Sequence, residues 1–319
     1  DRHVCKFLGI GANDSVAVDT VDGGTDRITG SEWVGMAGVR LDSSWSDRIA
    51  STVVASVGTS QIDARSRNSN DVVNGLDRGR DVDLQFRGEV RRRSGWLGDV
   101  LAGVAVKAFT FDYELLAYGV WSPYSPSHED IRATSRHSFA DLAGYVETTI
   151  PLFGKGRLSA GMRVDRWGAS TLTTGSPRVK ADYQLGGRAR LVANWGVYRQ
   201  SVPYIWMASA PRNVSLAPIR SVQVGGGIDV ELRKGIRFGI EGFDKQYRNY
   251  PVDDMAPGHV LVDAAADFES PFVGDLTSAG RVHAQGLDTV VSASLGRHVQ
   301  AVANYSYWRV LQMGLDHAW

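Results

Sequence analysis

The sequence is poor in cysteine, with Cys5 as the single one in 319 residues. One cysteine excludes an internal disulfide framework and a Cys-x-x-Cys metal site. No apolar run reaches the length of about eighteen residues that a membrane-spanning helix needs, so helical spanning is excluded. Long windows with helical spacing of apolar residues are also missing, and the chain is therefore predicted to be all-β.

Net charge is absent as well, because 35 lysines and arginines balance 35 aspartates and glutamates. Without a global basic field, nucleic acid is not expected as a partner. The 7 histidines show no metal-ligand spacing, and neither a Gly-x-Ser-x-Gly elbow nor a phosphate-binding glycine pattern occurs. We expect no catalytic residues, no metal site and no cofactor, and so no enzyme.

What the sequence does contain is alternation. Residues 81–90 read DVDLQFRGEV, with apolar or small residues at every second position and polar or charged ones between them. Successive side chains of a strand point to opposite faces, so this pattern predicts a strand with one uncharged and one charged face. Residues 158–165, 188–197 and 222–232 repeat it. A soluble β-sandwich and a membrane barrel with a hydrated lumen both fit such alternation.

The connections between the strands favour the barrel. About twelve strands are predicted, after a poorly patterned stretch that extends to about residue 30. Tight turns, such as RRSGW, PLFGKG and RKG, alternate with mostly long polar loops, which are predicted at 61–80, 113–136, 200–218 and 248–280. Loop lengths segregated in this way are typical of an antiparallel up-and-down transmembrane β-barrel with short periplasmic turns and long extracellular loops.

The uncharged faces use many small residues, which would pack a dry core poorly but suit a wall against lipid. Aromatic residues near strand ends fit the interfacial girdles of such a barrel. These aromatic residues are Trp33, Trp45, Trp96, Trp167, Tyr183, Tyr198, Tyr247, Tyr305 and Tyr307.

Three segments resemble a known family: 176–204, 216–252 and 283–310. They contain, in order, a Pro-Arg strand, a Leu-x-Pro followed by a Gly-rich strand, a Phe-x-Lys-x-Tyr arm, and an Ala-x-Gly strand before Tyr-Ser-Tyr. This order resembles the barrel of TonB-dependent outer-membrane receptors. The resemblance implies an importer of a scarce nutrient, most often a ferric siderophore, but also haem, cobalamin or a saccharide. Such receptors have a 22-stranded barrel with an N-terminal plug that contacts the energising complex.

The chain departs from that pattern, because it shows no plug or TonB box and too few strands to close the family's barrel. Residues 1–319 are therefore predicted to be a single barrel region, an internal piece of a longer receptor of the Gram-negative outer membrane. The implied partners are outer-membrane lipid, a ferric siderophore or similar small ligand, and the TonB complex through a plug outside this chain. A complete small porin-like barrel ending at Trp319 and a soluble β-sandwich binding protein remain alternatives.

Ligand recognition is expected in the long loops, because loops on a rigid scaffold carry binding. Aromatic and cationic side chains suit catecholate or other anionic chelates. The alternative for each residue is that it only fills space in its loop. The candidates are Tyr118, Trp121, Tyr124, Tyr204, Trp206 and Arg212.

Overall fold

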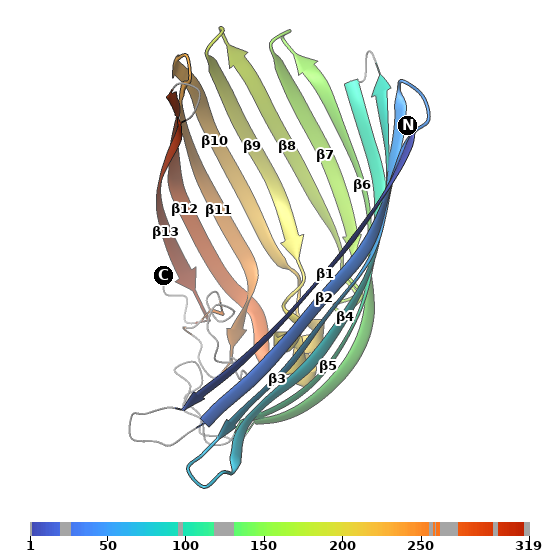
Figure 1. Cartoon of the computed structure of the whole chain (residues 1–319), viewed down its shortest axis with the longest axis vertical. Coiled ribbons are helices and arrows are strands. Elements are labelled where there is room, and N and C mark those ends of the chain that lie inside the picture. Colours follow the sequence, from blue (N-terminus) through green and yellow to red (C-terminus); the bar gives the residue numbers. More distant parts are fainter. Residues whose placement is uncertain are drawn as a thin grey trace.

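The described chain forms one curved sheet whose thirteen strands follow one another in sequence order (Figure 1). The computed structural model describes residues 2–19, 27–94, 98–117, 131–254, 258, 260–261, 274–295 and 299–315. The strands are β1 (His3–Asp19), β2 (Arg27–Ser44), β3 (Ile49–Arg67), β4 (Val73–Ser94), β5 (Gly98–Ala117), β6 (Ile131–Leu152), β7 (Gly156–Arg166), β8 (Thr173–Leu185), β9 (Ala189–Gln200), β10 (Ile219–Arg233), β11 (Ile236–Asp253), β12 (Leu276–Leu295) and β13 (Val299–Met313).

Every pair of neighbouring strands is antiparallel, from β1 with β2 to β12 with β13. The predicted all-β, up-and-down architecture is confirmed. The β-sandwich alternative is wrong, because the described strands form one layer and no second sheet covers it. Within these residues β1 and β13 are the two edges of the sheet and do not pair with each other.

Several predicted strand limits are wrong, and all of the errors shorten a strand. The poorly patterned first 30 residues hold β1 and the start of β2. The loops predicted at 61–80, 113–136 and 248–280 are partly strand, since β3 reaches Arg67 and β6 already starts at Ile131. Backbone pairing continues there although apolar and polar side chains no longer alternate, so the period-two signal disappears while the strand does not. The count of about twelve strands becomes thirteen.

The segregation of connection lengths is confirmed. Turns 45–48, 153–155, 186–188 and 234–235 lie together at one end of the sheet, at the top of Figure 1. Loop 201–218 and the described connections 68–72 and 167–172 lie at the opposite end. Gly154, Gly186 and Gly235 adopt φ of 71°, 63° and 84° in these turns, a backbone conformation that glycine reaches without strain. Residues 95–97 and 296–298 belong to predicted turns that lie outside the described residues.

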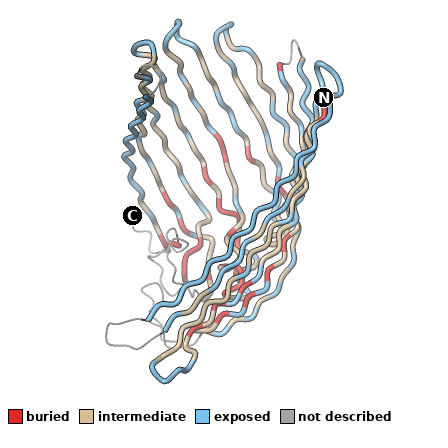
Figure 2. Tube along the Cα trace, viewed as in Figure 1, coloured by how far each residue is buried: buried red, intermediate tan, exposed pale blue. Residues whose placement is uncertain are grey.

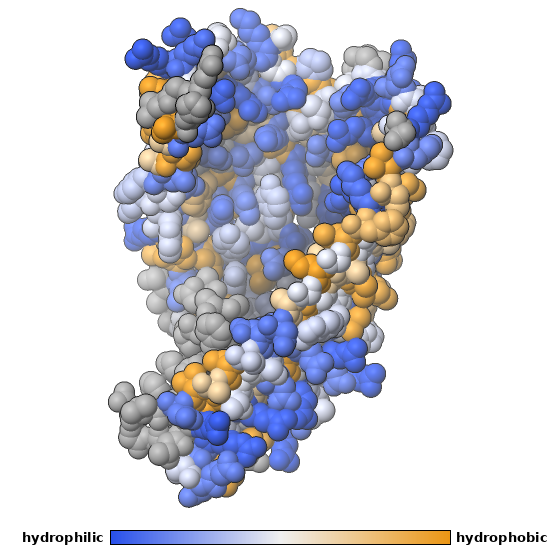
Figure 3. Space-filling model, in the orientation of Figure 1, coloured by the Kyte–Doolittle hydropathy of each residue, from blue (hydrophilic) through white to orange (hydrophobic). Residues whose placement is uncertain are grey.

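The two faces of the sheet differ as the alternation predicts. We call the face that carries Leu84 and Val90 the outward face; these side chains are 54% and 50% exposed. On β4 the outward positions between Arg80 and Arg92 are uncharged. Arg80 and Arg92 are 12 residue steps apart; at a rise of about 3.3 Å per step and a tilt of about 40°, they bound an uncharged band about 30 Å tall. In Figure 3 hydrophilic side chains gather at both ends of the molecule and across the concave interior.

The aromatic residues divide between the two faces. Trp33, Trp45 and Tyr305 are exposed on the outward face, where a girdle is expected. Tyr198 instead lies on the concave face, where the Arg178 guanidinium is 4.5 Å from its ring centroid. Tyr247 packs against the buried cluster on that face. The girdle prediction is wrong for these two, because proximity to a strand end does not decide which face a side chain occupies.

The buried residues gather on the concave side near the longer loops (Figure 2). Phe109, Phe111 and Leu115 of β5 pack there against helix α1 (Tyr204–Ala208) and the 3-10 helix η1 (Pro211–Ser215). Both short helices belong to the connection between β9 and β10, which the sequence predicts only as a loop. Within the described residues, no helix is long and apolar enough to cross a membrane.

Gly79 gives a test of the concave packing. A Cβ atom at Gly79 would overlap the ring of Tyr113, whereas one at Gly144 on the outward face of β6 would meet nothing within 4 Å. We expect Gly79→Val to lower the free energy of unfolding by about 1–3 kcal/mol, and Gly144→Val to leave it unchanged or to raise it. Urea unfolding in detergent micelles measures both, and equal effects of the two substitutions would contradict this packing.

Candidate functional site

Charged side chains from neighbouring strands meet on the concave wall. Strand register places Gln85 of β4 opposite Lys107 of β5, and Lys107 opposite Asp141 of β6. The Lys107 ammonium also lies 3.3 Å from a carboxylate oxygen of Asp83. The charged half of the alternation in residues 81–90 therefore forms the inner wall of the sheet, where Asp83 pairs with Lys107 and Glu89 with Arg87.

Tyr204 of α1 connects loop 201–218 to this wall. Its hydroxyl donates a hydrogen bond to Asp83 Oδ1 at 2.9 Å, and its ring stacks on Phe109 with centroids 4.8 Å apart. Lys107 Nζ lies 5.1 Å from the centroid of the Tyr204 ring. Burial, and then the nearby charge of Asp83, raise the pKa of Tyr204, so the hydroxyl remains a neutral donor.

Tyr113 of β5 makes a second tyrosine–carboxylate pair beside the first. Its hydroxyl donates to Asp81 Oδ2 at 2.9 Å. The other oxygen of this carboxylate, Oδ1, is buried and has no hydrogen-bond partner among the described residues. Two aspartates of one strand are thus each held by a tyrosine, one from the wall and one from the loop.

A hollow of about 500 Å³ opens on the concave side next to Lys107. Charges of both signs and amide groups converge on it, which suits a polar ligand that is oriented by hydrogen bonds. Arg163 of β7 is paired with Asp165 at 2.8 Å, and Asp141 accepts a hydrogen bond from the Gly168 amide at 2.7 Å. Its polar lining is Ser56, Gln85, Arg87, Lys107, Asp141, Arg163, Asp165, Gln200 and Ser201.

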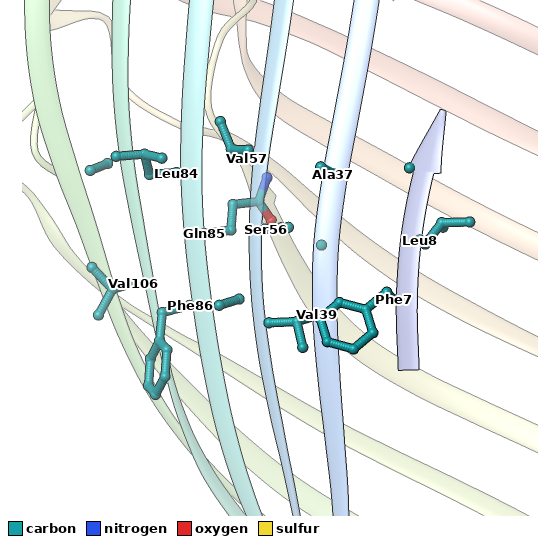
Figure 4. A pocket seen from close by; sticks show the side chains of 14 residues that line it. Phe7, Leu8, Ala37, Val39, Ser56, Val57, Leu84, Gln85, Phe86 and Val106 are labelled. Carbon is teal, nitrogen blue, oxygen red and sulfur yellow. The ribbon is translucent and has the colours of Figure 1, made fainter. Parts of the chain in front are cut away.

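A larger hollow of about 710 Å³ lies over β1–β5 and has a different character (Figure 4). Phe7, Val39, Leu84, Phe86 and Val106 surround it. These side chains belong to the uncharged outward face, so the hollow lacks charged groups that could orient a polar ligand. We place the candidate site on the concave face, in the smaller hollow.

The far half of loop 201–218 is tied to the strands beyond it. Asn213 is fully buried, and its Nδ2 donates to the carbonyl oxygens of Trp206 and Gly274, both at 3.0 Å. Its Oδ1 accepts from the Leu276 amide at 2.9 Å. The Arg212 guanidinium lies 3.1 Å from the Asp275 carboxylate. The loop is therefore anchored at α1 to β4 and β5, and at η1 to the start of β12.

The predicted ligand-binding residues fall into two groups. Tyr118, Trp121 and Tyr124 lie outside the described residues. The other three all lie in loop 201–218. Tyr204 lies on the concave wall, Trp206 is 3% exposed inside the buried cluster, and the Arg212 side chain is 66% exposed. Their contact with a ligand stays a prediction.

The list of candidates lacks every polar residue that lines the hollow, and it lacks Asp83, the partner of Tyr204 and Lys107. The alternation places Asp83 on the charged face. No local pattern connects it to Tyr204, which lies 121 residues away in the sequence. Contacts at such separation depend on how the sheet curves, which alternation does not specify.

The comparison with protein families identifies the chain. The family model for the TonB-dependent receptor-like β-barrel matches residues 11–317. The chain belongs to this family. No curated protein sequence matches it.

Solved structures with the same fold are receptors and transporters. The siderophore receptor PirA of Pseudomonas aeruginosa is 15% identical with a TM-score of 0.55, and the match covers 96% of this chain and 63% of PirA. The outer membrane transporter YddB of Escherichia coli is 9% identical with a TM-score of 0.69, and the match covers 98% of this chain and 46% of YddB. The ferric enterobactin receptor PfeA of Pseudomonas aeruginosa is 13% identical with a TM-score of 0.62, and the match covers 95% of this chain and 51% of PfeA. This TonB-dependent receptor barrel region thus spans less than two thirds of each.

The tyrosine bond to Asp83 gives a prediction for the receptor barrel. Tyr204→Phe removes a hydrogen bond to a charged group, which contributes about 1.5–3 kcal/mol. We expect faster amide hydrogen exchange in residues 201–218, measured by mass spectrometry. Tyr305→Phe is the matched control, because Tyr305 is 64% exposed on the outward face. Unchanged exchange in Tyr204→Phe would show that this bond does not hold the loop.

Proposed function

We propose that this receptor barrel region belongs to an outer-membrane importer of a scarce nutrient, and that the nutrient is a ferric siderophore. The observation that carries the proposal is the division of the sheet into two faces. A charged concave wall surrounds a polar hollow, and an uncharged outward band has the height of a bilayer's hydrocarbon core. A transport path for a polar ligand needs the charged wall, and contact with lipid needs the uncharged band.

The chemistry of the hollow supports an anionic chelate as its ligand. Arg87, Lys107 and Arg163 supply three cations, and cations with adjacent aromatic rings attract electron-rich anionic groups. Asp83 keeps Lys107 ordered and Asp165 keeps Arg163 ordered, and Asp141 and Asp165 in the lining can accept hydrogen bonds from ligand hydroxyls. The six predicted loop residues would add five aromatic side chains and one cation, Arg212, at the loop end of the barrel.

An experiment on the substrate must also include other cargoes, because receptors with this fold carry several kinds. Among similar structures are the copper transporter OprC, with 14% identity and a TM-score of 0.62, and the RagAB peptide transporter, with 11% and 0.58. At such identity the likeness shows the fold alone.

The remaining parts of the proposal concern the whole receptor. Residues 1–319 form its barrel region, short turns face the periplasm and longer loops face outside. Energy would come from the TonB complex through a plug domain outside this chain. The protein would act by binding and moving its ligand, without catalysis.

Location is the first test. We expect the full-length receptor in the sarkosyl-resistant outer-membrane fraction, because its uncharged band leaves it insoluble without lipid or detergent. Immunoblotting of membrane and periplasmic fractions measures this. Recovery of the protein in the soluble periplasm would contradict both the membrane location and the import function.

Uptake is the second test. In cells that depend on the full-length receptor, Lys107→Met should lower uptake of a radiolabelled ferric catecholate about tenfold, the loss expected from one charged contact. Lys234→Met, in a turn at the opposite end of the sheet, should leave uptake unchanged. Copper and a labelled oligopeptide are tested in parallel. Uptake of either, without uptake of ferric chelates, would overturn the siderophore assignment while leaving the importer.

A further inference from the structure

Four arginines stand side by side across four neighbouring strands. Register places Arg199 of β9 opposite Arg220 of β10, Arg220 opposite Arg248 of β11, and Arg248 opposite Arg281 of β12. Strands lie about 4.8 Å apart, so the row is about 14 Å long. We call these four residues the arginine row.

The arginine row lies on the outward face, close to the longer loops. Alternation gives Arg199 the same face as Trp195, and Arg220 the same face as Val224; these two side chains are 40% and 49% exposed. One step toward the short turns, the outward positions on β9 and β10 are Val197 and Val222. The row therefore begins where the uncharged band of these strands ends.

No ion pair within the described residues neutralises the row; the charge of Asp165 reaches Arg199 but is outweighed there by that of Arg220. Arg199 Nε is buried without a hydrogen-bond partner among these residues. The outward carboxylate of Asp244, two positions before Gln246 on β11, is engaged by His283. Like charges directly opposite each other on neighbouring strands destabilise a sheet. Four in succession therefore call for an anion from outside the chain.

We propose that the arginine row binds the headgroup of a phosphorylated lipid in the outward-facing leaflet of the membrane. Guanidinium groups pair with phosphate through two parallel hydrogen bonds, which makes arginine well suited to this group. A row about 14 Å long exceeds what one phosphate contacts, so the headgroup should carry more than one. The acyl chains would lie along Val222, Val224 and Trp195.

The surroundings favour a bulky headgroup. Toward the short turns, the first outward positions after Arg199 and Arg220 are already apolar. In the same direction, the first outward positions after Arg248 and Arg281 are Gln246 and His283, and the next are Asp244 and Gln285. The row thus rises from the apolar band into a polar zone, so a ligand along it meets hydrocarbon at one end and water at the other. Such a gradient matches a lipid whose phosphates lie at different depths in the membrane. Free phosphate has no apolar part that could contact the apolar end of the row.

The experiment uses the full-length receptor in detergent and native mass spectrometry. Bis-phosphorylated lipid A is the probe, and monophosphoryl lipid A, phosphatidylcholine and inorganic phosphate are the comparisons. We expect Arg199→Gln with Arg220→Gln to weaken lipid A retention about tenfold or more. The double change Arg80→Gln with Arg92→Gln removes two outward arginines outside the row and should leave retention unchanged. Arg80 stands opposite Asp112, not opposite another arginine.

Folding is read separately, from the heat-modifiable gel band. The charge-keeping change Arg199→Lys with Arg220→Lys should retain most lipid binding. If the glutamine pair does not fold, the exposed pair Arg248→Gln with Arg281→Gln is decisive. Equal retention by folded row and control variants overturns the proposal, as does displacement of lipid A by millimolar inorganic phosphate.

The inference rests on the proposed membrane location but not on the cargo. A receptor found in the outer membrane whose row variants retain lipid A normally leaves the importer intact and removes only the lipid site. A receptor absent from that membrane removes both.

Discussion

Backbone pairing within one layer is the constraint on which the structure depends. Each strand from β2 to β12 pairs its backbone with two neighbours, so the side chains alone decide what either face of the sheet contacts. On β4 this places Asp83 and Gln85 on the concave face and Leu84 and Phe86 on the outward one. A shift of one residue in the register would exchange the two environments for the whole strand. The charged wall and the uncharged band are consequences of the same pairing.

The candidate site adds a second level of order to that wall. Curvature of the sheet brings β5 within reach of loop 201–218, and Tyr204 meets Asp83, Lys107 and Phe109 there. The same loop is fixed at its far end by Asn213, which bonds residues on both sides of it. Because Tyr204 contacts Asp83 and Lys107, and Lys107 lines the hollow, a ligand that competes for Lys107 or Asp83 would act on the loop as well. Binding and loop position are in this way linked through shared hydrogen bonds.

The outward face carries information beyond its lack of charge. Its uncharged band ends at different positions on different strands, as expected where tilted strands cross a flat boundary. The arginine row marks that boundary on β9 and β10 and rises above it on β11 and β12. These four guanidinium groups form no ion pair with the described residues, and an anion outside the protein would relieve their mutual repulsion.

Alternation and turn residues predicted the strand type, the short turns around Gly186 and Gly235, and the segregation of loop lengths, because these depend on neighbours in the sequence. The family resemblance added the barrel and its class. Only the tertiary structure decided that β3 and β4 continue through their polar ends, that Trp206 is buried, and that Asp83 meets Tyr204. These facts depend on contacts across strands and on sheet curvature, which fix the partners of a side chain long after local periodicity has ceased to specify them.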